Sequence, residues 1–166
     1  MPILLTDGDI ERLLAEKKPL PDDYRRRLIL KAKRGHKEGQ IDVKGVDGSE
    51  FRVILRQLNV NPLDFSAVLA YLVPQSNQVF RLRRYNGKSH EHTNKLEGQI
   101  LDYGFHIHHA TERYQESGWR EDDFAERTDR YSDFSSTVDC LIMDCGFELP
   151  HDPQSSLLRT GGLNIS

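Results

Sequence analysis

The sequence is poor in cysteine, with two in 166 residues. Cys140 and Cys145 are five residues apart in one predicted helix, which places them on different faces and disfavours a disulfide between them. No second cysteine pair is present to complete a zinc site. We therefore expect both thiols to be reduced, one of them buried in the core, and neither to bind a metal.

Long apolar runs are also missing. The first residues, Met-Pro-Ile-Leu-Leu, lack the charged and apolar regions of a signal peptide. No apolar run approaches the roughly 20 residues that a membrane-spanning helix requires. The sequence thus predicts a cytoplasmic protein with no membrane partner.

Several catalytic signatures are absent. The glycines of Gly45-Val46-Asp47-Gly48 form a hairpin turn and no phosphate loop, because no Gly-Lys-Ser/Thr follows them. The His-Glu-x-x-His signature of zinc peptidases and the Gly-x-Ser-x-Gly elbow of serine hydrolases do not occur. The absence of these motifs disfavours a nucleotide-hydrolysing P-loop and these two hydrolase types.

Charge is unevenly distributed along the chain. The net charge is −3 and the isoelectric point is near 6.2, which argues against a protein that coats nucleic acid over its whole surface. Residues 17–37 hold nine lysines or arginines and two aspartates, whereas residues 112–133 hold eight acids and four arginines. This polarity either steers a polyanion to one side of the fold or forms an ordinary solvated surface.

The composition, 37% hydrophobic and 30% charged, predicts a single domain over residues 1–149 followed by a tail over residues 150–166. The order Thr6-Asp7-Gly8-Asp9 indicates a helix start, and Asp22 begins a second helical piece that ends at Arg27. Residues 28–35 are compatible with either helix or extended chain. Near the end, Ser132 is expected to cap a helix that runs to Cys145 and stops at Gly146.

Between these helices the apolar residues alternate with polar ones. A hairpin is predicted over residues 41–56, with strands at 64–73, 78–85 and 101–109. Residues 86–98 are expected to form a loop, and residues 112–130 to be irregular or weakly helical with Tyr114 and Trp119 as anchors. Short connections favour an antiparallel meander. The predicted fold is α+β: about five antiparallel strands, N-terminal helical pieces and one C-terminal helix packed on one face.

Histidine and arginine gather on two of these strands. Five of the seven histidines lie within residues 80–94 and 105–111. Strict alternation would place Arg81 and Arg83 on one face, with Tyr85 continuing their row. His106 and His108 would match them on the last strand. The earlier hairpin adds Arg52 and Arg56 to the same face.

These residue types suit cleavage of RNA without a metal or other cofactor. One group must take the 2′-hydroxyl proton, another must protonate the leaving oxygen, and cations must stabilise the charged phosphorane. We assign His106 and His108 as acid and base in either order, and Tyr85 as a hydroxyl donor or stacking platform. The expected substrate-binding residues are Arg81, Arg83, Arg84, Asn86, His90, His92, Arg52 and Arg56.

Two other functions use the same residues. In the first, the face binds nucleic acid or an acidic protein without catalysis, since polar alternation is also ordinary on an exposed sheet face. In the second, His90, His92, His106, His108 and His109 supply ligands to a metal-dependent hydrolase. The neighbouring arginines would repel a divalent cation, which disfavours this second alternative.

Four features of the chain resemble the TumE-like toxins of prokaryotic toxin–antitoxin pairs. They are the Arg-Tyr-Asn at 84–86, the His-x-His at 90–92, the Phe-His-x-His at 105–108, and the closing helix with its Ser-Asp start. The likeness spans about residues 65–145, and the basic N-terminal extension, the longer insert before the last helix and the tail depart from it. The resemblance implies a toxin-like protein that acts on RNA or on a translation component, including ribosome-associated RNA. It also implies a cognate antitoxin partner. Association into a homo-oligomer is left open.

Overall fold

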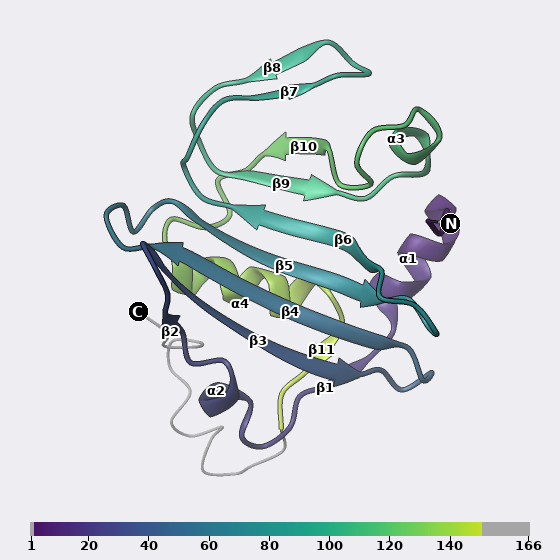
Figure 1. Ribbon diagram of the computed structural model, residues 1–166, viewed down its shortest axis with the longest axis vertical. Helices are drawn as coiled ribbons and strands as arrows, with labels where there is room; N and C mark the ends of the chain where they lie inside the picture. Colours follow the sequence, from purple (N-terminus) through teal and green to yellow (C-terminus); the bar gives the residue numbers. More distant parts are fainter. Residues whose placement is uncertain (1, 151–166) are drawn as a thin grey trace.

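The computed structural model describes residues 2–150 and places a seven-stranded antiparallel sheet at the centre of the molecule (Figure 1). Neighbouring strands follow the order β10-β9-β6-β5-β4-β3-β2. The strands are β2 (Lys31–Ala32), β3 (His36–Lys44), β4 (Glu50–Leu58), β5 (Phe65–Leu72), β6 (Val79–Asn86), β9 (His106–His109) and β10 (Phe124–Arg127). The middle of the sheet, β3 to β6, is the predicted meander, because each strand pairs with the next in the chain.

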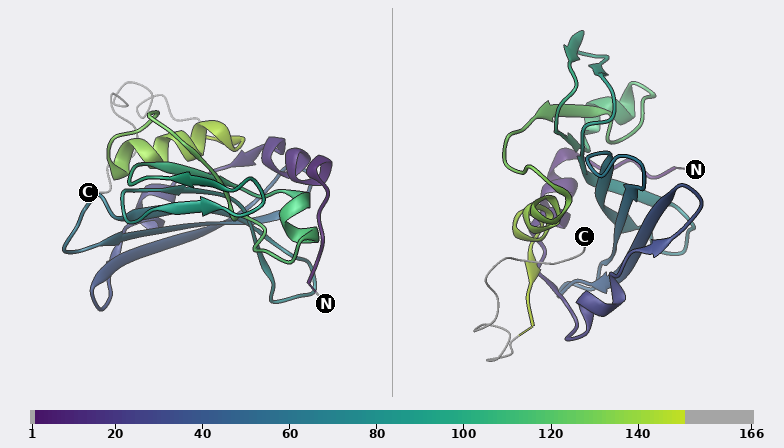
Figure 2. Two further views of the ribbon diagram at one scale, coloured as in Figure 1. Left: turned by 90° about the horizontal axis from the view of Figure 1, so that it is seen from above. Right: turned by 90° about the vertical axis from the view of Figure 1, so that its left-hand side faces the viewer.

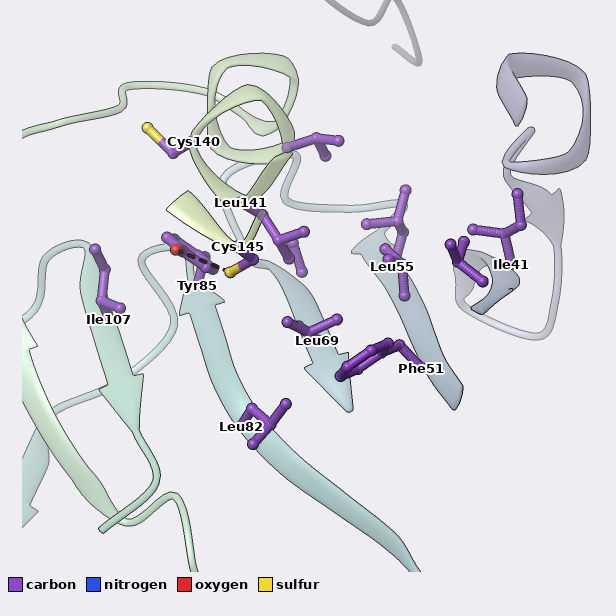
Figure 3. Packing of buried hydrophobic residues seen from close by; sticks show 14 of the residues in the cluster. Ile41, Phe51, Leu55, Leu69, Leu82, Tyr85, Ile107, Cys140, Leu141 and Cys145 are labelled. Atoms are coloured by element: carbon purple, nitrogen blue, oxygen red, sulfur yellow. Dashed lines mark hydrogen bonds between the residues drawn. The ribbon is translucent and has the colours of Figure 1, made fainter. Parts of the chain in front are cut away.

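Two helices, α1 (Asp7–Ala15) and α4 (Phe134–Asp144), lie on one face of the sheet (Figure 2). Thr6 and Asp133 cap their first turns through capping boxes, and Gly146 ends the second helix with φ +77°. Between helices and sheet lies the core, in which apolar side chains from β3, β4, β5, β6 and β9 meet those of α4 (Figure 3). This burial fixes which face of each strand remains for solvent.

The remaining elements are short. They are β1 (Lys18–Pro19), which pairs in parallel with β11 (Phe147–Glu148), the helices α2 (Tyr24–Arg27) and α3 (Glu112–Glu116), and a hairpin of β7 (His92–Asn94) and β8 (Gln99–Leu101). The β7–β8 hairpin lies beside β10, at one end of the sheet (Figure 1).

A buried lysine joins the ends of both main helices. The ammonium of Lys18 is fully buried and donates hydrogen bonds to the carbonyl oxygens of Leu13, Leu14 and Glu16, at the end of α1, over 2.8, 3.2 and 2.8 Å. It also donates to the carbonyl of Cys145, at the end of α4, over 2.7 Å. Burial lowers the pKa of Lys18 to about 8. Helix C-termini leave carbonyls without partners, and a cation there also complements the helix dipole.

The β7–β8 hairpin is attached to the edge of the sheet by a side chain. Asn94 is fully buried; its amide oxygen accepts from the backbone N–H of Ala125 over 2.9 Å, and its amide nitrogen donates to the carbonyl of the same residue over 2.8 Å. The side chain thereby substitutes for a strand neighbour along β10. Unpaired N–H and C=O groups on an edge strand would otherwise be left exposed to pairing with another chain.

The predicted α+β class, the antiparallel sheet and the C-terminal helix on one face are confirmed, with seven strands in the main sheet where about five were expected. The hairpin over residues 41–56 is also confirmed. The region predicted as one strand over 101–109 is divided, because β8 ends at Leu101 and β9 begins at His106. Asp133 and not Ser132 caps α4.

Short strands also form in regions where no strand was predicted. β7 lies in the expected loop 86–98, β10 in the irregular region 112–130, and β2 in the undecided stretch 28–35. Tyr114 is a buried anchor as expected, whereas Trp119 is 43% exposed. Both cysteines are free and buried, where one was expected in the core. The predicted tail over residues 150–166 lies, apart from Pro150, outside the described residues.

Within residues 2–150, no helix has both the length and the apolar character needed to cross a membrane.

Candidate functional site

The face of the sheet opposite α1 and α4, here called the open face, carries most of the predicted site. Side chains in register across neighbouring strands form rows on this face. One row runs Arg56, Ser66, Asn86, His106, and the next runs Ile54, Val68, Arg84, His108. A third row holds Arg52, Ala70 and Arg81.

A β-bulge in β6 changes the predicted alternation. The register shifts between Leu69 and Ala70, which pair with Arg83 and Arg81 respectively, so Leu82 is the extra residue. As a result Arg81 and Arg84 lie on the open face, and Arg83 turns to the helix face. The prediction that Arg81 and Arg83 share a face was therefore wrong.

Tyr85 also lies on the helix face, contrary to the prediction that it continues the arginine row. It pairs in register with Ala67, a core residue, and is fully buried. Its hydroxyl donates to Asp144 over 2.7 Å and contacts the sulfur of Cys145 (Figure 3). Burial, the neighbouring Cys145 and the bond to Asp144 raise the pKa of Tyr85 far above its ordinary value. The hydrogen bond of this hydroxyl therefore links β6 to α4. The hydroxyl lies on the helix face, away from the open face.

Arg83 and His109 pair across β6 and β9 on the helix face as well. Burial and the charge of Arg83 lower the pKa of His109. The last histidine of the cluster is therefore separated by the sheet from His106 and His108.

A buried carboxylate that was not predicted holds two of the open-face arginines. Asp122 is fully buried, and its Oδ2 accepts from Nε of Arg84 over 2.9 Å. Nε of Arg81 lies 3.5 Å from Oδ1 of Asp122 and 3.4 Å from Glu121. A buried charge requires a partner, so this network fixes the guanidinium of Arg84 in one orientation. The sequence offered no signal for Asp122 beyond its place in the acidic stretch.

The predicted catalytic imidazoles are buried beneath this network. His106 and His108 are each 3% exposed. Nδ1 of His108 lies 2.8 Å from the carbonyl oxygen of Asp122 and 3.3 Å from Nη2 of Arg84. Burial and the charge of Arg84 lower the pKa of His108 far below its ordinary value, and burial also lowers the pKa of His106. Both rings are neutral at physiological pH.

His92 completes a group of three neighbouring imidazoles. Its ring meets that of His108 edge to face with centroids 4.7 Å apart, and the centroid of His106 is 6.5 Å away. Nε2 of His92 donates to the carbonyl of Asp123 over 2.7 Å. Through this bond the ring attaches the β7–β8 hairpin to the segment before β10.

A concavity of about 150 Å³ opens on the open face where β4 and β6 end and β5 begins. Four predicted substrate-binding residues line it: Arg56, Arg84, Asn86 and His90. The other lining residues are Leu58, Asp64, Phe65, Ser66 and Ser89. The structure therefore brings together half of the predicted binding set, contributed by two strands and the turn after β6.

Gly87 makes this arrangement possible. A Cβ at residue 87 would collide with the carbonyl oxygen of Leu63, so only glycine lets the turn after β6 approach the loop before β5. Lys88 then donates its backbone N–H to the same carbonyl over 2.7 Å. His90 follows on this turn, exposed, with Nδ1 2.8 Å from the hydroxyl of Ser89.

The cations in the concavity differ in their partners. Arg84 is 21% exposed and bonded to Asp122, whereas Arg56 is exposed and has no hydrogen-bond or ion-pair partner among the described residues. Arg52 lies outside the concavity, and its guanidinium donates two hydrogen bonds to the carboxylate of Asp42, over 2.7 and 3.1 Å. Asn86 is 7% exposed, and its buried amide oxygen has no hydrogen-bond partner within residues 2–150. Of the two arginines in the concavity, Arg84 is therefore neutralised by a carboxylate and Arg56 is not.

No three or more His, Cys, Asp and Glu side chains come together in residues 2–150 in a way that could hold a metal ion. In comparisons with known proteins, no family model, no curated protein and no solved structure matches the chain. The resemblance to the TumE-like toxins stays a prediction.

Proposed function

We propose that the open face binds RNA through its phosphate backbone, with one phosphate held in the concavity beside Arg56 and Arg84. The observation that carries this proposal is the exposed guanidinium of Arg56, which has no ion-pair partner in residues 2–150 and shares one hollow of the open face with Arg84, Asn86 and His90. A guanidinium binds phosphate oxygens with two parallel hydrogen bonds, which makes arginine suited to this ligand.

The two arginines have separate parts in this binding. Arg84 is already oriented by Asp122, so little side-chain entropy is lost when its remaining N–H groups meet a ligand. Arg56 supplies a positive charge that attracts an anion, because no carboxylate lies within ion-pairing distance of it in the described part of the chain, although Asp64 also lines the concavity. Asn86 and Ser66 add uncharged hydrogen-bonding groups.

Binding is tested with a fluorescently labelled single-stranded RNA and anisotropy at several salt concentrations. The affinity should fall as salt rises, with a slope of about −0.7 per neutralised phosphate on a double-logarithmic plot. Arg56→Gln should weaken binding about tenfold, which is the loss of one charge-assisted hydrogen-bond site.

Arg12→Gln is the matched control, because it removes one exposed arginine from α1, on the other face of the sheet. It should leave the affinity unchanged. Equal losses in both variants, or binding that does not respond to salt, would contradict a specific site on the open face.

Cleavage of the bound RNA is a second candidate function, favoured by the exposed imidazole of His90 in the same concavity. His90 can reach a ligand, whereas His106 and His108 are buried. If the protein cleaves RNA, proton transfer is assigned to His90, whose orientation is set by Ser89. General acid–base catalysis contributes about 10²–10⁴ in rate, so the loss on mutation is large.

The decisive experiment compares cleavage of a mixed RNA pool, in the presence of a chelator, by the wild type, His90→Ala and His108→Ala. Loss of cleavage in His90→Ala alone supports this assignment. Loss in folded His108→Ala alone would restore the sequence-based assignment. No turnover by the wild type removes cleavage and leaves the binding proposal intact.

The toxin role, the cognate antitoxin and the cytoplasmic location are part of the proposal and derive from the sequence. Growth arrest on expression, relieved by the product of a neighbouring gene, tests the first two together. Growth that is unaffected by expression would remove the toxin role without bearing on RNA binding.

A further inference from the structure

A second concavity, of about 260 Å³, lies at the β2 end of the same sheet. It is formed where the chain between α2 and β2 runs along β3 and β4. Its lining residues are Arg27, Ile29, Lys31, Lys33, Glu38, Gly39, Gln40 and Ile54. None of these residues was predicted to bind a ligand, although the basic stretch 17–37 contains four of them.

The two concavities are neighbours on β4. Ile54 lines the second and Arg56 lines the first, and residues two apart on a strand share a face and are about 6.6 Å apart. Glu38, from the second concavity, pairs in register with Arg56. A ligand that extends from the first concavity across β4 therefore enters the second.

The second concavity combines positive charge with an apolar surface. Lys31 and Lys33 are exposed and have no ion-pair partner in the described residues, and Glu38 is the one acid in the lining. Ile29 is 56% exposed and Ile54 is half-buried beside it. A nucleotide presents the complementary pair of groups, an anionic phosphate and a flat base with an apolar face.

We propose that this concavity is a second nucleotide subsite. The ligand of the open face is then an RNA chain that spans both hollows and not a free mononucleotide. This inference rests on the proposed function above, because it extends the same binding face. The lysines hold a phosphate adjacent to the one at Arg56, and Ile29 and Ile54 pack against a base. Two linked subsites raise affinity because the second contact is intramolecular once the first has formed.

The test compares uridine monophosphate with oligouridines of two to eight nucleotides, at about physiological salt, by calorimetry or competition. Wild type should bind the longer oligonucleotides at least tenfold more tightly than the mononucleotide. Lys31→Gln/Lys33→Gln should lose most of this gain and keep the affinity for the mononucleotide.

Arg34→Gln/Lys37→Gln is the matched control, because these residues lie on the same basic segment, are exposed, and line neither concavity. It should retain the gain with length. A second variant, Ile29→Ser, should weaken binding of oligouridine and have no effect on an abasic oligomer of the same length.

Each outcome separates the two proposals. If the wild type binds neither mononucleotide nor oligonucleotide, the proposed function fails and the subsite fails with it. If oligonucleotides bind with no gain over the mononucleotide, or if both double variants reduce the gain equally, the subsite alone is overturned. Binding of an acidic peptide that depends on Lys31 and Lys33, with no such dependence for RNA, would likewise overturn it.

Discussion

At the scale of single residues, the imidazoles of this protein divide into buried and accessible ones. His106 and His108 are buried, and the cost of placing a charge away from water lowers the pKa of both rings. At His108 the charge of Arg84 lowers the pKa further. His90 is exposed in the concavity. The division separates histidines that stabilise the sheet from one that can meet a ligand.

This division predicts how stability depends on pH. In the unfolded chain a histidine takes up a proton near pH 6.5, whereas His108 has a much lower pKa in the fold. The unfolded state therefore binds more protons below pH 6.5, and stability must fall as the pH falls. Each such histidine contributes about 1.4 kcal/mol per pH unit, so unfolding in urea between pH 6 and pH 5 should show at least this slope.

Substitution of His108 isolates its contribution to the pH dependence of stability. His108→Gln should make the slope shallower by about 1.4 kcal/mol per pH unit. An identical slope in wild type and His108→Gln would show that the ring of His108 is protonated in the folded protein.

Which face each site residue occupies was only partly predictable. The alternation of Arg52, Ile54 and Arg56 with buried apolar residues gave the correct face, because β4 is regular. In β6 the same reasoning failed at Leu82, since a bulge is decided by pairing with the neighbouring strand and leaves no mark in the local pattern. Arg84 was named as a binding residue, but its partner Asp122 is 38 residues away and no local pattern connects them.

At the scale of elements, single polar side chains join segments too short to be stable alone. The hairpin of β7 and β8 has three residues in each strand and depends on Asn94 for its attachment to β10. The ends of α1 and α4 depend on Lys18. Strands of two or three residues carry too little alternation to be predicted, whereas β3 to β6, with eight or nine residues each, were predicted correctly.

Asn94→Ala should destabilise the protein by about 2–3 kcal/mol, because it leaves the buried N–H and C=O of Ala125 without partners. Thr93→Ala, at the exposed neighbouring position, should have an effect within about 0.5 kcal/mol. Urea denaturation measures both, and hydrogen exchange at the Ala125 amide should accelerate in Asn94→Ala. Unchanged exchange there would mean that the hairpin is not attached to β10 by this side chain.

Lys18→Met should cost about 3 kcal/mol, because several carbonyls at the ends of α1 and α4 lose their donor inside the protein. Lys17→Met removes a charge from an exposed position and should cost less than about 0.5 kcal/mol. Denaturation midpoints of the two variants give the comparison. Similar midpoints would show that the packing of the lysine stem alone stabilises this junction.

At the scale of the whole molecule, the sheet separates two surfaces. One face is covered by α1 and α4, and the other presents two basic concavities on adjacent strands. The uneven charge seen in the sequence has a structural counterpart, because the basic segment before β3 lines one concavity while Glu121 and Asp122 neutralise arginines beside the other. A protein with a net charge of −3 can still attract a polyanion locally in this way.

The most direct test of the account is a titration of isotope-labelled protein with a short single-stranded RNA, followed by amide and side-chain NMR shifts. The largest shifts are expected at Arg56, Arg84, Asn86 and His90, with further shifts at Ile29 and Lys31 for longer chains. Residues of α1 and α4 should stay unperturbed. Shifts confined to the helix side of the sheet, or no shifts at any concentration of RNA, would contradict it.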